Sequence, residues 1–184
     1  MKFDPASCIT SFGMAVYRAC FSEEENMLIS PLSLMIALGM VLNGADEQAK
    51  EEVLRLTGTF VREKDFHEAL TKLMHALPSD QDTSFSFADA LFYKEGLRVK
   101  KRFIKALEKQ YDATVRSMVF DESAAKEINE WVNDHTHGMI DRIIDGASPE
   151  AVLYLINALA FEGEWQKIYE TSDVRPGIFT NYKK

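Results

Sequence analysis

The chain has 184 residues, of which 46% are apolar and 27% charged, and its formal net charge at pH 7 is −8. So large an apolar fraction excludes a disordered chain, and the acidic balance argues against a general nucleic-acid-binding protein. No apolar run reaches the length that crosses a bilayer, so we expect no membrane partner.

A first helix is predicted after Asp4, which is suited to cap it, with Pro5 in the first turn and apolar residues at helical spacing. This helix carries Cys8 and Cys20. Their separation corresponds to roughly 18 Å along a helix, which is too far for a disulfide, so we predict two free thiols. The first residues contain no apolar stretch resembling a signal peptide, and we leave the localisation open between extracellular and intracellular.

A second helix is predicted to begin at Pro31 and to end at Asn43-Gly44. Apolar residues occupy most of its circumference, which is typical of a buried helix. Residues 27–29 just before it are compatible with a short strand. Ser30 and Ser33 stand at the entrance of this apolar segment, where each buried hydroxyl needs a hydrogen-bond partner.

Two more helices are predicted next, and strands then alternate with helices. Asp46 is expected to cap a helix that Gly58 ends, and a fourth helix is expected over 65–77, followed by a loop at 79–84. The remaining pattern predicts a strand at 85–94, a helix at 100–111, a strand at 113–120 and a helix that begins at Asp121 and carries Ile128, Trp131, Val132 and Met139.

Residues 151–161 form an apolar run without alternation, which predicts a central strand covered on both faces and interrupted only by Asn157. Residues 178–182 are predicted to begin one more strand. Helices dominate the first half and strands appear later, so the fold class is α+β, with helices packed on a sheet. The chain contains no repeat or linker, which predicts a single domain over 1–184.

The sequence carries few signs of catalysis. It contains no glycine-rich phosphate loop, nucleophile elbow or metal-binding helix, so an unrelated α+β enzyme is disfavoured and no metal or cofactor is expected. His135 and His137 are two residues apart, which places them on different sides of a helix. We therefore favour ordinary surface histidines over a metal site. The basic residues within 98–105 can bind a polyanion, but we favour the solvent-exposed face of a helix.

Ser30, Ser33 and Asn157 each lie in an apolar context, and two interpretations remain open. Each can make a separate bond, with Ser30 as a helix cap, Ser33 bonded back to its own helix and Asn157 at a bulge. Alternatively, the three side chains meet where the buried helix passes beneath the strand.

Four ordered motifs strengthen the second interpretation. These are NMLISPLSLMIALGMVLNGA (26–45), INEWVNDHTHGMIDRII (128–144), LINALAFEGEW (155–165) and RPGIFTN (175–181). Together they resemble the serpin family, in its second helix, its sixth helix with the following loop, the third strand of its main sheet and the segment that enters the next sheet. The chain departs from the usual residues of the family at a few positions, namely Ala49, Ala160, Glu162 and Glu164.

The resemblance implies a serpin-like α+β fold with helices packed on a large mixed β-sheet. We expect residues 1–184 to form one partial serpin domain, with three strands of the main sheet and without the C-terminal part that carries the reactive loop. No reactive-site bond is therefore named. A complete serpin is a suicide-substrate inhibitor of serine, sometimes cysteine, endopeptidases and not an enzyme; the alternative is a non-inhibitory serpin with a carrier, chaperone or storage role.

The resemblance also assigns conformational roles to particular residues. Ser30, Ser33 and Asn157 would form the shutter beneath the centre of the sheet, Trp165 would lie in the breach where insertion begins, and the helix of Trp131 would cover the sheet. The expected partners are a target protease, through the reactive loop, and the protein's own C-terminal piece or a second copy, through an exposed sheet edge. The fragment alone is predicted to be inactive.

Overall fold

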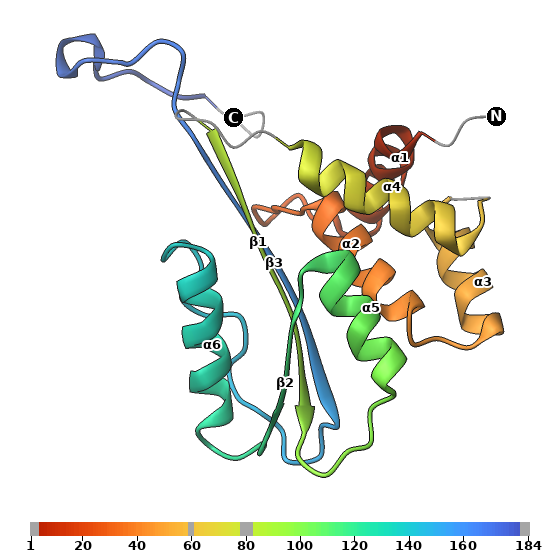
Figure 1. The fold of residues 1–184 in the computed structure, drawn as a ribbon. Coiled ribbons are helices and arrows are strands. Elements are labelled where there is room, and N and C mark those ends of the chain that lie inside the picture. Colours follow the sequence, from red (N-terminus) through yellow and green to blue (C-terminus); the bar gives the residue numbers. More distant parts are fainter. Residues whose placement is uncertain (1–3, 59–60, 78–82, 181–184) are drawn as a thin grey trace.

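A computed structural model describes residues 4–58, 61–77 and 83–180 (Figure 1). Four helices come first, and strands alternate with helices afterwards, which confirms the α+β fold class. The first four helices form one group, and the strands run beside it as a long, narrow sheet with α5 and α6 along its sides (Figure 1).

Side-chain caps from aspartates explain where two of the early helices begin. Asp4 accepts from the Ala6 amide at the start of α1 (Pro5–Cys20), as predicted. Asp46 does the same for the Ala49 amide at the start of α3 (Glu47–Leu56), at 2.9 Å. The remaining helices are α2 (Pro31–Leu42), α4 (Glu63–Ala76), α5 (Lys101–Tyr111) and α6 (Ala124–His135). Both cysteines are free, and α1 carries them as predicted.

The sheet has three strands in the order β2-β1-β3. Their bounds are β1 (Thr83–Lys94), β2 (Thr114–Met118) and β3 (Leu153–Gly163). β1 lies in the middle, parallel to β2 and antiparallel to β3, so the sheet is mixed. The short β2 covers only the end of β1, whereas β3 pairs along nearly all of it.

Alternate residues of β1 enter two different cores, because successive side chains of a strand point to opposite faces. Ala88, Ala90 and Phe92 pack against α6 on one face. Leu91 packs on the other face with residues of α2 and α5. The sheet is therefore a layer between α6 and the pair α2 and α5.

α2 contributes to two cores at once. Ile36 and Met40 face the sheet, while Met35 and Leu42 pack against α1 and α4 in a third cluster. The prediction that α2 is buried holds for these faces. α2 therefore joins the outer helices to the sheet.

Several predicted boundaries were wrong. Residues 27–29 are not a strand, and Leu28 is 97% exposed with no neighbouring strand. Residues 178–180 belong to no strand, and 181–182 lie outside the described residues. Thr83 and Ser84 belong to β1, where they pair with β3, rather than to a loop; the rest of that predicted loop, 79–82, lies outside the described residues.

Two further corrections concern α6 and β3. Met139 is not on α6, because the helix ends at His135 and Gly138 adopts a left-handed φ of 79°. The run 151–161 is a strand from Leu153, but among the described residues it is an edge strand rather than a central one. The apolar run indicates that the two faces of the strand are covered. It does not indicate whether both edges of the strand pair with a neighbour, and the prediction of a central strand assumed that they do.

Gly39 on α2 offers a test of this packing. A Cβ at Gly39 would lie 2.3 Å from the hydroxyl oxygen of Tyr111 on α5, so Gly39→Ala must separate the two helices. We expect it to lower the free energy of unfolding by about 1–3 kcal/mol, measured by urea unfolding. Gly146→Ala is the control, because nothing lies within 4 Å of its added Cβ. Equal urea midpoints for the two variants would contradict the described packing of α2 on α5.

Candidate functional site

A polar cluster lies beneath the sheet on the α2 side. Asp89 of β1 and Asn157 of β3 stand directly opposite each other in the antiparallel register. Their neighbour Leu91 packs on α2 and α5, and alternation along β1 places Asp89 on the same face. Ser33 reaches this face from the first turn of α2.

The Asn157 amide joins three elements. Its Nδ2 donates to Asp89 Oδ1 at 2.6 Å, and its Oδ1 accepts from the Ser33 hydroxyl. A single side chain of β3 is thereby bonded to both β1 and α2. We call Ser33, Asp89 and Asn157 the polar junction.

Ser30 is the N-cap residue of α2 and is not bonded to Asn157. Its hydroxyl oxygen accepts from the backbone N–H of Ser33 at 3.2 Å and so caps α2. The cap holds the first turn of α2, and with it the side chain of Ser33, in place. Ser30 therefore supports the polar junction through the backbone.

Asp89 has an unusual electrostatic environment for a carboxyl group. It is only 4% exposed, and burial raises its pKa from 3.8 to about 7, although the hydrogen bond from Asn157 opposes this rise. The second oxygen, Oδ2, is buried and has no hydrogen-bond partner among the described residues. An ionised Asp89 would thus be a poorly compensated buried charge.

Tyr111 of α5 lies in the same core. Its hydroxyl is hydrogen-bonded to Nδ1 of His67 on α4, at 2.7 Å. Burial strongly raises the pKa of Tyr111, and the charge of Asp89 adds to this effect. Burial also lowers the pKa of His67, so both groups are neutral at neutral pH. They offer the polar junction no positive charge.

The opposite face of the sheet is covered by α6. Trp131 packs edge-on against Phe92 of β1, with ring centroids 5.6 Å apart, and His135 stacks on Trp131 at 4.1 Å. Asn129 accepts from the amides of Ile143 and Ile144, which fixes the segment that follows α6. Trp131 thus lies on a helix that packs against this face of the sheet.

β3 has one paired edge and one open edge. Its inner edge pairs with β1 from Leu153 to Gly163. Within the part of the chain that the structure describes, no strand pairs with its outer edge. The outer edge therefore presents free backbone N–H and C=O groups.

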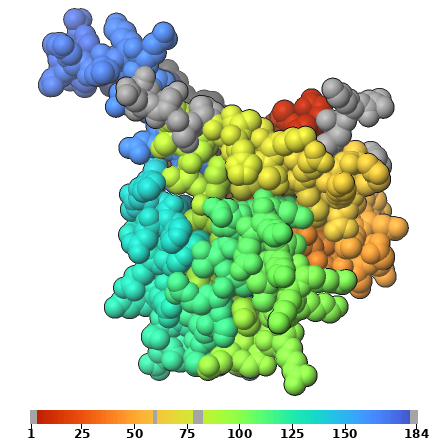
Figure 2. Space-filling view, viewed as in Figure 1, coloured from red at the N-terminus to blue at the C-terminus, as the bar shows by residue number. Residues whose placement is uncertain are grey.

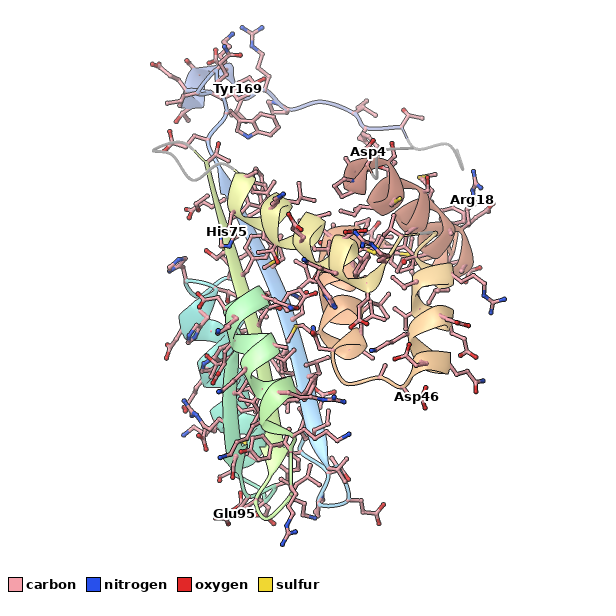
Figure 3. The ribbon with its side chains drawn as sticks, turned by 45° about the vertical axis from the view of Figure 1, so that its right-hand side comes forward. Asp4, Arg18, Asp46, His75, Glu95 and Tyr169 are labelled. Atoms are coloured by element: carbon pink, nitrogen blue, oxygen red, sulfur yellow. The ribbon has the colours of Figure 1, made fainter. Side chains whose placement is uncertain are left out.

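Trp165 lies just beyond the end of β3 and is 79% exposed. The segment from 164 to 180 leaves the body of the structure and projects away from it (Figure 2). Tyr169 of this segment lies at the opposite end of the sheet from Glu95, which follows β1 (Figure 3). Trp165 thus lies beyond the end of β3, whereas Asn157 of the polar junction lies in the middle of that strand.

The structure brings together two of the three predicted shutter residues, Ser33 and Asn157, and makes Ser30 the helix cap. Sequence reasoning missed Asp89. The available signal was a carboxyl group between two alanines in the apolar strand FADALF (87–92). Among the described residues no group of three side chains suits a metal ion, and no helix is long and apolar enough to span a membrane.

The sequence matches the family model of the serpins, described as serine protease inhibitors, over residues 7–184. This chain belongs to the serpin family. Members of this family are protease inhibitors and not enzymes, although some members are non-inhibitory.

Two related serpins and one solved structure illustrate the likeness. The chain is 28% identical to neuroserpin of Gallus gallus, over 96% of this chain and 45% of that protein. It is 28% identical to corticosteroid-binding globulin of Saimiri sciureus, over 95% of this chain and 45% of that protein. The structure of the thermophilic serpin tengpin in the latent state matches with 33% identity and a TM-score of 0.89, over 100% of this chain and 51% of tengpin. The chain spans about half the length of the curated relatives it matches.

A double-mutant cycle tests the polar junction of this serpin. Ser33→Ala and Asn157→Ala should be non-additive by about 0.5–3 kcal/mol in unfolding free energy, because the two side chains share a hydrogen bond. Asp134→Ala paired with Asn157→Ala is the control and should be additive within about 0.5 kcal/mol, because Asp134 is exposed on α6, on the other face of the sheet. Additivity of the Ser33 pair in urea unfolding would show that the Ser33–Asn157 bond contributes nothing.

Proposed function

We propose that the complete protein is a suicide-substrate inhibitor of serine or cysteine endopeptidases. A target protease would cut an exposed reactive loop, and the cut loop would insert into the main sheet as a new strand. Serpins are known to inhibit in this way. The observation that carries the proposal is the open outer edge of β3, which lies beside a fully paired inner edge.

An open edge suits strand addition for a physical reason. The free backbone groups of an edge strand can pair with another extended segment without breaking existing bonds. The inner edge of β3 stays bonded to β1 during such an event. We therefore propose that β3 borders the position that an inserted loop would occupy.

We propose that Ser33 and Asn157, supported by the Ser30 cap, act as the shutter. Their contact is a hydrogen bond between side chains, which can break while strands move and re-form in one register afterwards. An apolar contact lacks this fixed direction, because the hydrophobic effect is non-directional. In the same proposal, Trp165 belongs to the breach at the end of β3, and the helix of Trp131 must yield briefly as the sheet opens.

These residues would form part of a serpin domain and would not inhibit a protease by themselves. The open edge of β3 and the exposed apolar side chains of segment 164–180 would favour association. We propose two partners for them, the C-terminal piece of the same protein or a second copy. The target protease would be bound through the reactive loop.

A non-inhibitory role is the second candidate. The relationship to corticosteroid-binding globulin, whose name describes a carrier, favours it to the same degree as the relationship to neuroserpin favours inhibition. The polar junction is compatible with both roles. The two candidates differ in whether cleavage leads to insertion.

A protease panel separates the two candidates. The complete protein is incubated with serine and cysteine endopeptidases, and we expect a denaturant-resistant covalent complex with at least one of them. The cleaved form should also unfold at a higher temperature than the intact form, because insertion completes the sheet. Cleavage without complex and without a gain in unfolding temperature would assign the protein to the non-inhibitory serpins.

Ser33→Leu tests the shutter role. Leucine removes the hydroxyl that donates to Asn157 and adds volume at the α2–β3 contact, so the sheet should open more easily. We expect the variant of the complete protein to form polymers or an inactive monomer on gentle heating, measured by size-exclusion chromatography. Ser30→Asp, which keeps a side-chain cap for α2, is the control. Unchanged monomer content and unchanged inhibition would count against the shutter role.

A further inference from the structure

A buried acid lies at the contact between the helices and the sheet, and nothing about protease inhibition calls for one there. Asp89 is bonded to Asn157 through one oxygen and has no described partner for the other. We propose that Asp89 couples the junction of α2, β1 and β3 to pH, keeping it closed as the protonated acid and allowing it to open as the proton is lost. This inference needs no reactive loop and does not depend on inhibition.

The hydrogen bonds direct the effect of Asp89 ionisation to the Asn157 amide. Asn157 is held by Asp89 on one side of its amide and by Ser33 on the other. If the charge on Asp89 draws in water, the Asn157 amide loses a fixed position, and the bond to α2 weakens with it. The three elements would therefore respond together.

No described positive charge compensates Asp89 from the elements on its own face. α2 has no ionisable side chain between Pro31 and Leu42. α5 contributes Tyr111, which burial keeps neutral, while the charged side chains of that helix are exposed. α4 contributes His67 and Glu63, which reach the core only through Tyr111.

The remaining charges nearby are engaged or distant. Arg116 of β2 pairs with Glu127 of α6 at 2.9 Å, on the other face of the sheet. Lys94 is five positions from Asp89 along β1, which is roughly 17 Å, and its ammonium donates to the Pro149 carbonyl. β3 carries Glu162, also five positions beyond Asn157.

The direction of the pH effect follows from the pKa of Asp89. Burial raises it from 3.8 to about 7, so the closed junction binds a proton that the opened, hydrated carboxyl would release. Stability contributed by the protonated acid is complete below about pH 4 and is lost as the pH rises to about 7. Above that pH the carboxyl is ionised in both states, and the dependence ends.

Hydrogen exchange on the complete protein tests the coupling. Amide protection in β3, corrected for intrinsic exchange, is compared between the unmodified protein and Asp89→Asn, which keeps an acceptor for Asn157 and carries no charge. The protection factor of the unmodified protein is divided by that of Asp89→Asn at each pH. Between about pH 5 and pH 7 this ratio should fall by up to about tenfold per pH unit, and it should level off above pH 7. The control Asp134→Asn removes an exposed carboxylate on α6 and should keep the pH dependence of the unmodified protein.

A second measurement does not depend on the variants. The carboxyl carbon of Asp89 is followed by NMR in the unmodified complete protein from about pH 4 to pH 9, and we expect it to titrate near pH 7. Titration near pH 4 would overturn the inference, because Asp89 would then be ionised and compensated throughout. Identical pH profiles for Asp89→Asn and the unmodified protein would overturn it as well. Neither result would bear on inhibition, which the protease panel tests separately.

Discussion

The two hydrogen bonds of the Asn157 amide hold α2, β1 and β3 in one relative position. The amide donates to Asp89 across the sheet and accepts from Ser33 on the helix below. A shift of β3 by one residue would turn Asn157 to the α6 face, because strand side chains alternate. The buried Asp89 would then lose the hydrogen bond from Asn157, and the half-buried Ser33 would lose its acceptor. The cost of that loss fixes the register of the sheet against the helices.

The polar junction lies where the outer helices meet the sheet. α2 packs its Met35 side against α1 and α4 and its Ile36 side against the strands. Apolar packing of this kind supplies most of the stabilisation but tolerates sliding. The polar junction adds the directional contact, and the cap at Ser30 keeps the first turn of α2 in place for it.

β3 has two unlike edges, and this asymmetry links the structure to the family. The inner edge is bonded to β1, and its face is bonded to α2 through Asn157. The outer edge is open among the described residues. In a serpin, a strand of this kind can accept a new neighbour while its other contacts persist. Asp89 makes the same contacts sensitive to protonation, because a charge there is buried without a described counter-charge.

The sequence by itself determined the helix starts at Asp4 and Asp46, the α+β class and the family, because caps, periodicity and motifs are local features of the chain. It also identified Ser33 and Asn157 as polar residues in apolar segments. Only the tertiary structure decided that they bond to each other, that β3 lies at an edge and that Asp89 belongs with them. Those facts depend on which strands pair and which face meets α2. A local pattern such as FADALF (87–92) can mark a polar residue in an apolar strand, but it does not identify the partner of that residue.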